Sequence, residues 1–134
     1  RDASGQSCRR NRFYVMSMRF DQIRDHRWPS GGDQPIAILA VPVEQLAEKC
    51  GFVLDEWEED GLGSARGFAF VLPSGRIVLL YELAHMDGRT GSGANVSVDL
   101  GDLAAIGPTE IVAEVLSALQ LPQSAIYWIL AVTC

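Results

Sequence analysis

Apolar residues recur at helical spacing in two segments of the chain. In the first segment, four of them occupy positions i, i+3, i+4 and i+7: Val43, Leu46, Ala47 and Cys50. Pro42 stands where a first helical residue is tolerated, and Gly51 follows as a stop that can take positive φ. The second segment, 108–120, has one apolar and one polar stripe. The sequence therefore predicts two amphipathic helices.

Shorter apolar runs indicate β-strands. The clearest pair, 66–72 and 76–83, flanks the hairpin connection Pro73-Ser74-Gly75. Both alternating sets of side chains are apolar in these strands, as in central strands covered on both faces. Residues 95–100 alternate apolar and polar side chains, which predicts a strand with one wet face. Further strands are expected at 36–41, 52–58 and 125–132, the last again apolar on both sides.

These elements predict an α+β fold with the order β-α-β-β-β-β-α-β. It has a single, mainly antiparallel sheet of about five strands and two amphipathic helices. The domain is expected to span 36–134, after a linker at 29–35 that holds two prolines and two glycines. Residues 1–28 form a basic N-terminal arm, within which Phe20, Ile23 and Trp28 are candidates to anchor a short helical turn.

The N-terminal arm begins with Arg1 rather than methionine, so Met16 and Met18 are candidate natural starts. The residues before them are then interpreted as vector-derived or as a product of processing.

Two helices on one side of the predicted sheet leave its other apolar face to be covered. A large exposed apolar patch is unusual on a soluble monomer. We therefore expect either the N-terminal arm or a second copy of the chain on that face, which predicts an arm-covered sheet or a homodimer.

Composition narrows the class of protein. With 134 residues, 48% hydrophobic and 21% charged, the chain fits one ordinary globular domain. Its longest apolar run, 125–132, is far below the roughly 20 residues of a membrane span. Three cysteines lack any Cys-x-x-Cys spacing, which favours a reducing, cytoplasmic compartment over a disulfide framework: Cys8, Cys50 and Cys134.

Charge is distributed unevenly along the sequence. Residues 1–27 hold seven arginines and three aspartates, a net charge of +4, while the remaining residues carry a net charge of −10. An acidic body repels phosphate backbones, so no nucleic acid partner is expected. The basic arm either lies on this acidic body or extends into solvent.

Five carboxylates in six residues make 55–60 the strongest local anomaly, with a tryptophan among them: Asp55, Glu56, Trp57, Glu58, Glu59 and Asp60. The run is interpreted as a solvated acidic edge, as a surface for a basic partner anchored by Trp57, or as a site for a hard cation. In a strand, alternate side chains point to opposite faces, so these groups cannot all converge. No metal or other cofactor is expected.

A glycine-rich loop supplies the alternative, enzymatic hypothesis. His85 and Asp87 are candidates for a base and its orienting carboxylate beside a nucleophilic Ser92. The lysine and the Ser/Thr that a phosphate-binding loop requires after its last glycine are absent.

In size, charge and the placement of Trp57, the chain resembles the small acidic α/β immunity or antitoxin-like proteins of bacteria. The resemblance covers no specific motif and transfers no functional residues. It implies a non-enzymatic accessory protein whose acidic surface binds a basic protein. The alternatives are a small-molecule binder or hydrolase that uses the loop at 85–95, and a structural homodimer.

Overall fold

The protein folds as a mixed α+β domain around one antiparallel sheet. The computed structural model describes residues 20–24, 28, 31–59, 61, 63–83 and 93–131. Across these residues it contains seven strands, three α-helices and one 3-10 helix. In chain order they are β2 (Gln22–Ile23), β3 (Asp33–Leu39), α2 (Val43–Cys50), β4 (Asp55–Glu59), β5 (Gly63–Val71), β6 (Ile77–Leu83), β7 (Ala94–Asp99), α3 (Leu100–Ala105), α4 (Pro108–Leu119), the 3-10 helix η2 (Gln123–Ala125) and β8 (Ile126–Ile129).

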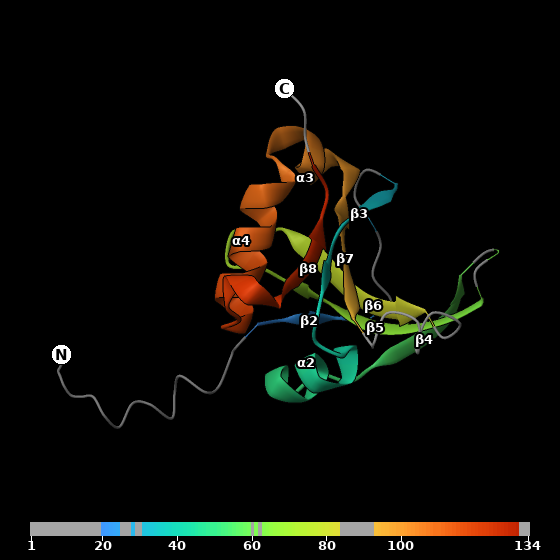
Figure 1. Cartoon of the computed structure of the whole chain (residues 1–134). Coiled ribbons are helices and arrows are strands. Elements are labelled where there is room, and N and C mark those ends of the chain that lie inside the picture. The colour runs from blue at the N-terminus through green and yellow to red at the C-terminus, as the bar shows by residue number, and fades with distance from the viewer. Residues whose placement is uncertain are drawn as a thin grey trace, which may run out of the picture.

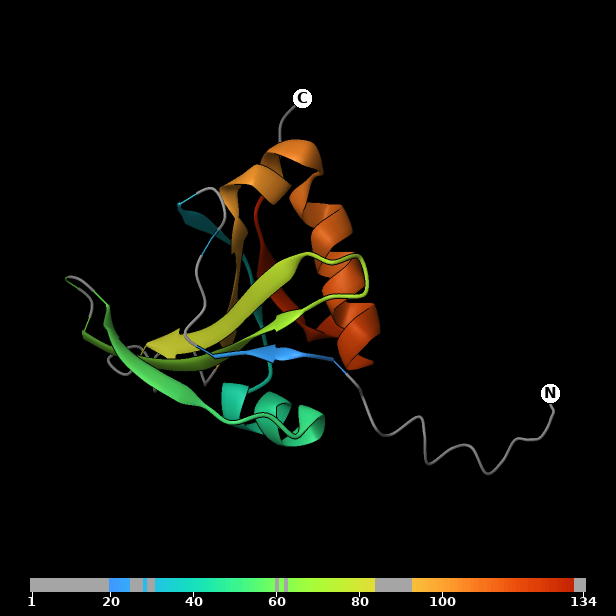
Figure 2. The ribbon, with the colours of Figure 1, turned by 180° about the vertical axis from the view of Figure 1, so that it is seen from behind.

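The strand order across the sheet is β2-β5-β6-β7-β3-β8, and β4 also pairs with β5. β2 and β4 share one edge of β5, because β2 lies opposite Ala69 and Phe70 while β4 lies opposite 63–67. Figure 2 shows β2 alongside β5, with β4 farther along the same strand. The sheet twists strongly, so that β4, β5 and β6 run across the view of Figure 1 while β7, β3 and β8 run up it. Among the strands that the structure describes, β2 and β4 are therefore outermost at one edge and β8 at the other.

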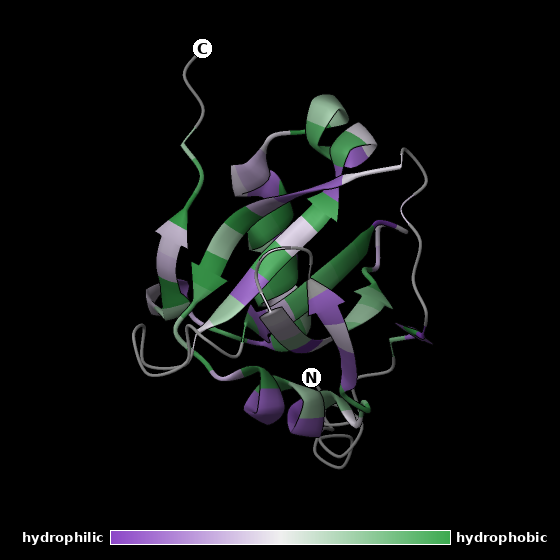
Figure 3. Cartoon of the chain, turned by 90° about the vertical axis from the view of Figure 1, so that its right-hand side faces the viewer, coloured by the Kyte–Doolittle hydropathy of each residue, from purple (hydrophilic) through white to green (hydrophobic). Residues whose placement is uncertain are grey.

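Helices α2 and α4 pack on one face of the sheet and close the core. α2 contacts β5 and β6, and α4 contacts β3. Figure 3 shows the hydrophilic residues of α2 turned outward and its apolar side turned toward the sheet. The sheet residues that share this face are almost fully buried: Phe68, Phe70, Val78, Leu80, Val96 and Val98.

The C-terminal end of α2 follows from local sequence, as predicted, whereas Pro42 is the N-cap and not the first helical residue, since α2 begins at Val43. Gly51 takes φ +75°, and the N–H of Phe52 donates to Ala47 O at 2.8 Å, which closes the last turn of α2. Gln120 ends α4 in the same way, in the left-handed conformation with φ +57°. The hairpin between β5 and β6 is also confirmed.

Several expectations about the elements are wrong in detail. Over the described residues the sheet has seven strands rather than about five, and α3 is a third helix that the pattern did not indicate. Gln22–Ile23 pairs with β5 instead of joining a helical turn. β3 begins at Asp33, inside the segment interpreted as a linker, and accommodates Pro35 next to an irregularity in its register with β7.

The face opposite the helices is partly buried within the single chain. Ala69 is 1% exposed and Leu79 is 5% exposed, so a second copy is not needed to cover them. On β7, Ser97 and Asp99 are also buried, so the wet face expected for 95–100 is wrong.

The last strand is an edge strand, not a central one. Among the described elements β8 pairs with β3 alone, and Tyr127 and Trp128 are 66% and 43% exposed. The central position expected for 125–132 is therefore wrong, because strand order is set by long-range pairing that an apolar run does not specify. No helix in the part of the chain that the structure describes has the length and hydrophobicity to cross a membrane.

Candidate functional site

The acidic run forms an edge strand of the sheet. β4 pairs in antiparallel register with β5, so that Glu56 lies opposite Arg66 and Trp57 opposite Ala65. Directly opposite residues share a face. Glu56 and Glu58 therefore lie on the helix side of the sheet, and Asp55 and Trp57 lie on the other side. The expectation that the carboxylates cannot all converge is confirmed for these positions; the side chain of Glu59 and all of Asp60 lie outside the described residues.

The main-chain groups of Glu56 and Glu58 point away from the sheet. Val71 N donates to Asp21 O, on the side of β5 where β2 and β4 lie. Residues two apart along a strand direct their main-chain groups to the same side, so 63, 65 and 67 also bond toward β4. Their partners are Glu59, Trp57 and Asp55. The N–H and C=O groups of Glu56 and Glu58 thus face away from β5, on a side where no described strand pairs with them.

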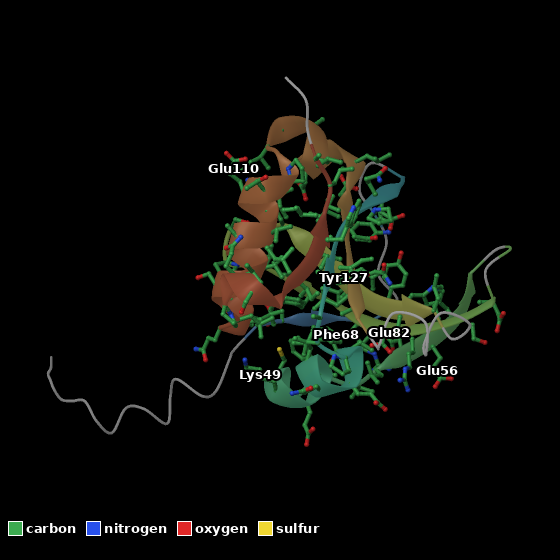
Figure 4. The ribbon with its side chains drawn as sticks, viewed as in Figure 1. Lys49, Glu56, Phe68, Glu82, Glu110 and Tyr127 are labelled. Atoms are coloured by element: carbon green, nitrogen blue, oxygen red, sulfur yellow. The ribbon has the colours of Figure 1, made fainter. Side chains whose placement is uncertain are left out.

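One arginine stands among the carboxylates on the helix side. Arg66 Nη1 lies 3.3 Å from Glu44 Oε2, and Arg66 Nη2 lies 3.5 Å from Glu82 Oε1. The Glu82 side chain is 4% exposed and its other oxygen accepts a hydrogen bond from Val43 N at 2.9 Å. Figure 4 shows Glu82 beside α2 and Glu56 farther out along β4. Arg66 is thus engaged by Glu44 and Glu82, and no described cation pairs with Glu56 or Glu58.

Glu56 and Glu58 are exposed and present their carboxylates to solvent. Ser64 Oγ donates to Glu58 Oε2 at 3.0 Å, which holds that side chain against β5. Two residues along a strand span about 7 Å, so the carboxylates form a regular pair along the edge.

The end of the N-terminal arm holds the chain at the start of β4. Arg24 Nη2 lies 2.6 Å from Asp55 Oδ1, and Gln22 bonds both main-chain groups of Val53 through its amide. The hydrogen bond and the charge of Asp55 raise the pKa of Arg24 further above its ordinary value. Among the described residues of the arm, Arg24 thus lies on the acidic body.

Trp57 belongs to a row of side chains that crosses the sheet on this face. Its ring centroid lies 6.2 Å from that of Tyr81 at an interplanar angle of 53°. From Tyr81 the register continues through Asn95 and Ile38 to Trp128 on β8. The row therefore links the acidic edge to the other edge of the sheet.

The enzymatic hypothesis lies outside the described residues, since His85, Asp87 and Ser92 all fall there. In the described ranges no three His, Cys, Asp or Glu side chains lie close enough to hold a metal ion. Cys50 is buried in the core as predicted, and desolvation raises the pKa of its thiol to about 11.

Sequence reasoning found β4 but missed Glu82. A signal was present, because Glu82 is the one charged residue in the apolar strand β6. A lone carboxylate in such a strand indicates a specific buried partner.

The comparisons with known proteins add no family: no protein-family model, no curated protein and no solved structure matches the chain.

Proposed function

We propose that the protein is a non-enzymatic binding module that takes up a basic segment of another protein as an added strand along β4. The observation that carries this proposal is the outward direction of the main-chain groups of Glu56 and Glu58, at a sheet edge where none of the described strands pairs with them. Strand addition uses such groups for affinity and alternate side chains for specificity. The resemblance to immunity or antitoxin-like proteins likewise implies that an acidic surface binds a basic protein.

The chemistry of the edge defines the partner. Exposed carboxylates normally protect an edge strand from pairing with apolar strands. An added strand with Arg or Lys at every second position would place its cations opposite Glu56 and Glu58, on the helix side. Its intervening residues would lie on the side of Trp57, where threonine or valine fits the half-buried Trp57–Tyr81 pair.

The probe is a synthetic ten-residue peptide that alternates arginine with threonine, titrated by calorimetry at 50 and 300 mM NaCl. We expect binding that weakens at least about tenfold at the higher salt, because exposed ion pairs are screened. The same peptide with glutamate in place of arginine should not bind. Affinity for the arginine peptide that is indifferent to salt would refute the proposal.

Two double variants that carry the same net charge as each other locate the binding site. Glu56→Gln with Glu58→Gln should weaken binding about tenfold, corresponding to two exposed pairs of about 0.7 kcal/mol each. Glu48→Gln with Glu110→Gln removes two exposed carboxylates from α2 and α4 and should change binding less than twofold. Equal losses in both variants would show a diffuse charge effect and contradict a site on β4.

A comparison of Glu58→Pro with Glu58→Gln tests whether the partner binds as an added strand. Both remove the charge, and only proline removes the outward N–H while leaving the bonds to β5 intact. A further loss of binding in the proline variant supports strand addition, and equal affinities contradict it.

A further inference from the structure

The second edge of the sheet differs in chemistry from the acidic one. β8 forms it, and Leu130 N donates to Ile36 O at 2.8 Å beyond the last ladder pair. Residues two apart direct their main-chain groups to the same side, so Leu130 and Trp128 face β3 while Ile129 and Ala131 face outward. Among the described residues no strand pairs with this outer side. Among the described residues, β8 thus presents the main-chain groups of Ile129 and Ala131 outward, beyond an irregularity in its register with β3 between Ile126 and Trp128.

The strand at this edge carries no charged side chain. No charged residue occurs from Ala125 to Ala131. Beside the strand, a small hollow of about 70 Å³ separates it from α4, and its lining is mostly apolar: Thr109, Val112, Ala113, Leu116, Gln123, Ile126 and Ile129. Figure 3 shows this edge as the strand that leads to the C-terminus, at the side of the sheet.

We propose that β8 pairs with β8 of a second copy of the chain, so that two sheets join across a two-fold axis. An antiparallel strand pair obeys two-fold symmetry, so a strand can pair with the same strand of a second copy. In that arrangement Ile129 of each copy lies next to the hollow of the other, on the helix side. The seam is a strand edge and not the sheet face first expected to carry a homodimer.

The absence of charged side chains on β8 favours a second copy of the chain over a basic protein as its partner. A basic partner would find no carboxylate on β8, whereas a second copy brings an equally uncharged strand. The net charge of −6 disfavours self-association in general. The acidic strand β4, however, is five strand spacings away, roughly 24 Å, which exceeds the screening length of about 10 Å. Two copies that meet at β8 keep their acidic edges farthest apart.

The test is the mass of the full chain by sedimentation equilibrium from 1 to 300 μM. We expect the dimer mass at the upper end, and a monomer throughout would overturn the proposal. Tyr127→Lys places like charges across the two-fold axis and should weaken the dimer at least about hundredfold. Val53→Lys introduces the same charge at a residue that is 54% exposed and away from β8, and it should leave the dimer unchanged. A dimer that is weakened more by Val53→Lys than by Tyr127→Lys would also overturn the proposal.

Amide hydrogen exchange tests the seam even if Tyr127→Lys fails to fold. In the wild-type protein the Ile129 N–H should exchange slowly at 300 μM and at least about tenfold faster at 1 μM, while the Leu130 N–H, bonded to Ile36, should not depend on dilution. Exchange of Ile129 that is independent of concentration would contradict the seam. This outcome is separate from peptide binding at β4.

Discussion

The carboxylate of Glu82 caps helix α2, whose first residue lies 39 positions earlier in the chain: Glu82 Oε2 accepts a hydrogen bond from Val43 N at 2.9 Å. α2 has no side-chain cap of its own, because Pro42 stands at the N-cap position. The positive end of the helix dipole and the nearby Arg66 both favour a carboxylate there. Glu82 thus ties the end of β6 to the start of α2, next to the proposed binding edge.

Replacing this carboxylate should destabilise the fold strongly. Glu82→Ala leaves the Val43 N–H without its partner in a buried position, and we expect a loss of about 2–4 kcal/mol in the free energy of unfolding. Glu82→Gln keeps an acceptor and should lose about 1 kcal/mol. Urea unfolding measures both.

The matched control for this prediction is Glu44→Gln, which removes a carboxylate that is 60% exposed and pairs with the same arginine. It should cost less than about 0.5 kcal/mol. Equal losses at Glu82 and Glu44 would show that the cap contributes nothing beyond a surface ion pair.

Gly67 is required by a close approach of two strands. A Cβ at this position would lie 2.1 Å from Leu80 O and 2.7 Å from the Cα of Tyr81. The obstructing atoms are main chain and cannot rotate away, so Gly67→Ala should lose at least about 3 kcal/mol. Thermal unfolding followed by circular dichroism measures the loss.

Gly75 provides the comparison for Gly67. It has φ +94°, and a Cβ at this position would have nothing within 4 Å, so alanine there meets only backbone strain. Gly75→Ala should cost about 1 kcal/mol. A ranking with Gly75 as the costlier position would contradict the steric argument.

The sequence predicts the elements whose signals are local. Periodic apolar residues with Gly51 as a stop define α2, and the turn at 73–75 defines the hairpin of β5 and β6. The acidic character of 55–60 is equally plain in the sequence, and so is the alternation of its side chains in a strand.

The parts that the sequence does not predict depend on long-range pairing. The apolar content of β8 suggests a central strand, although β8 pairs only with β3 among the described elements. The alternation at 95–100 suggests that Asp99 faces solvent, yet it is buried and its carboxylate accepts from Gly101 N to cap α3. β2 is two residues long, too short for any periodicity. The partner of Glu82 lies in another element and leaves no trace in the local pattern.

Glu114 fastens the turn of the central hairpin to helix α4. Its carboxylate accepts hydrogen bonds from Ser74 N at 2.8 Å and Ser74 Oγ at 2.9 Å, and lies 3.1 Å from Arg76 Nη1. Glu114→Ala should lose about 1–2 kcal/mol in the free energy of unfolding, because three polar groups lose one partner.

A local measurement separates this role of Glu114 from a general loss of helix stability. The Ser74 amide should exchange at least about tenfold faster in Glu114→Ala, whereas Glu110→Ala, at an exposed position of the same helix, should leave it unchanged. Slow exchange of Ser74 in both variants would contradict the proposed anchor.

The buried thiol of Cys50 should make stability depend on pH in the alkaline range. Burial raises its pKa to about 11, against an ordinary value of 9.0, and Lys49 opposes this shift only in part. Between these values the unfolded chain releases the thiol proton while the folded chain retains it, so the unfolded state is favoured as pH rises. The free energy of unfolding should therefore be insensitive to Cys50 below pH 9 and fall by about 1–2 kcal/mol on approach to pH 11.

Urea unfolding of the wild type and of Cys50→Ala at pH 8, 9.5 and 11 isolates this contribution, because lysines and tyrosines titrate in both proteins. The variant should start less stable and show the shallower decline, and parallel declines would mean that the folded thiol ionises as readily as the unfolded one.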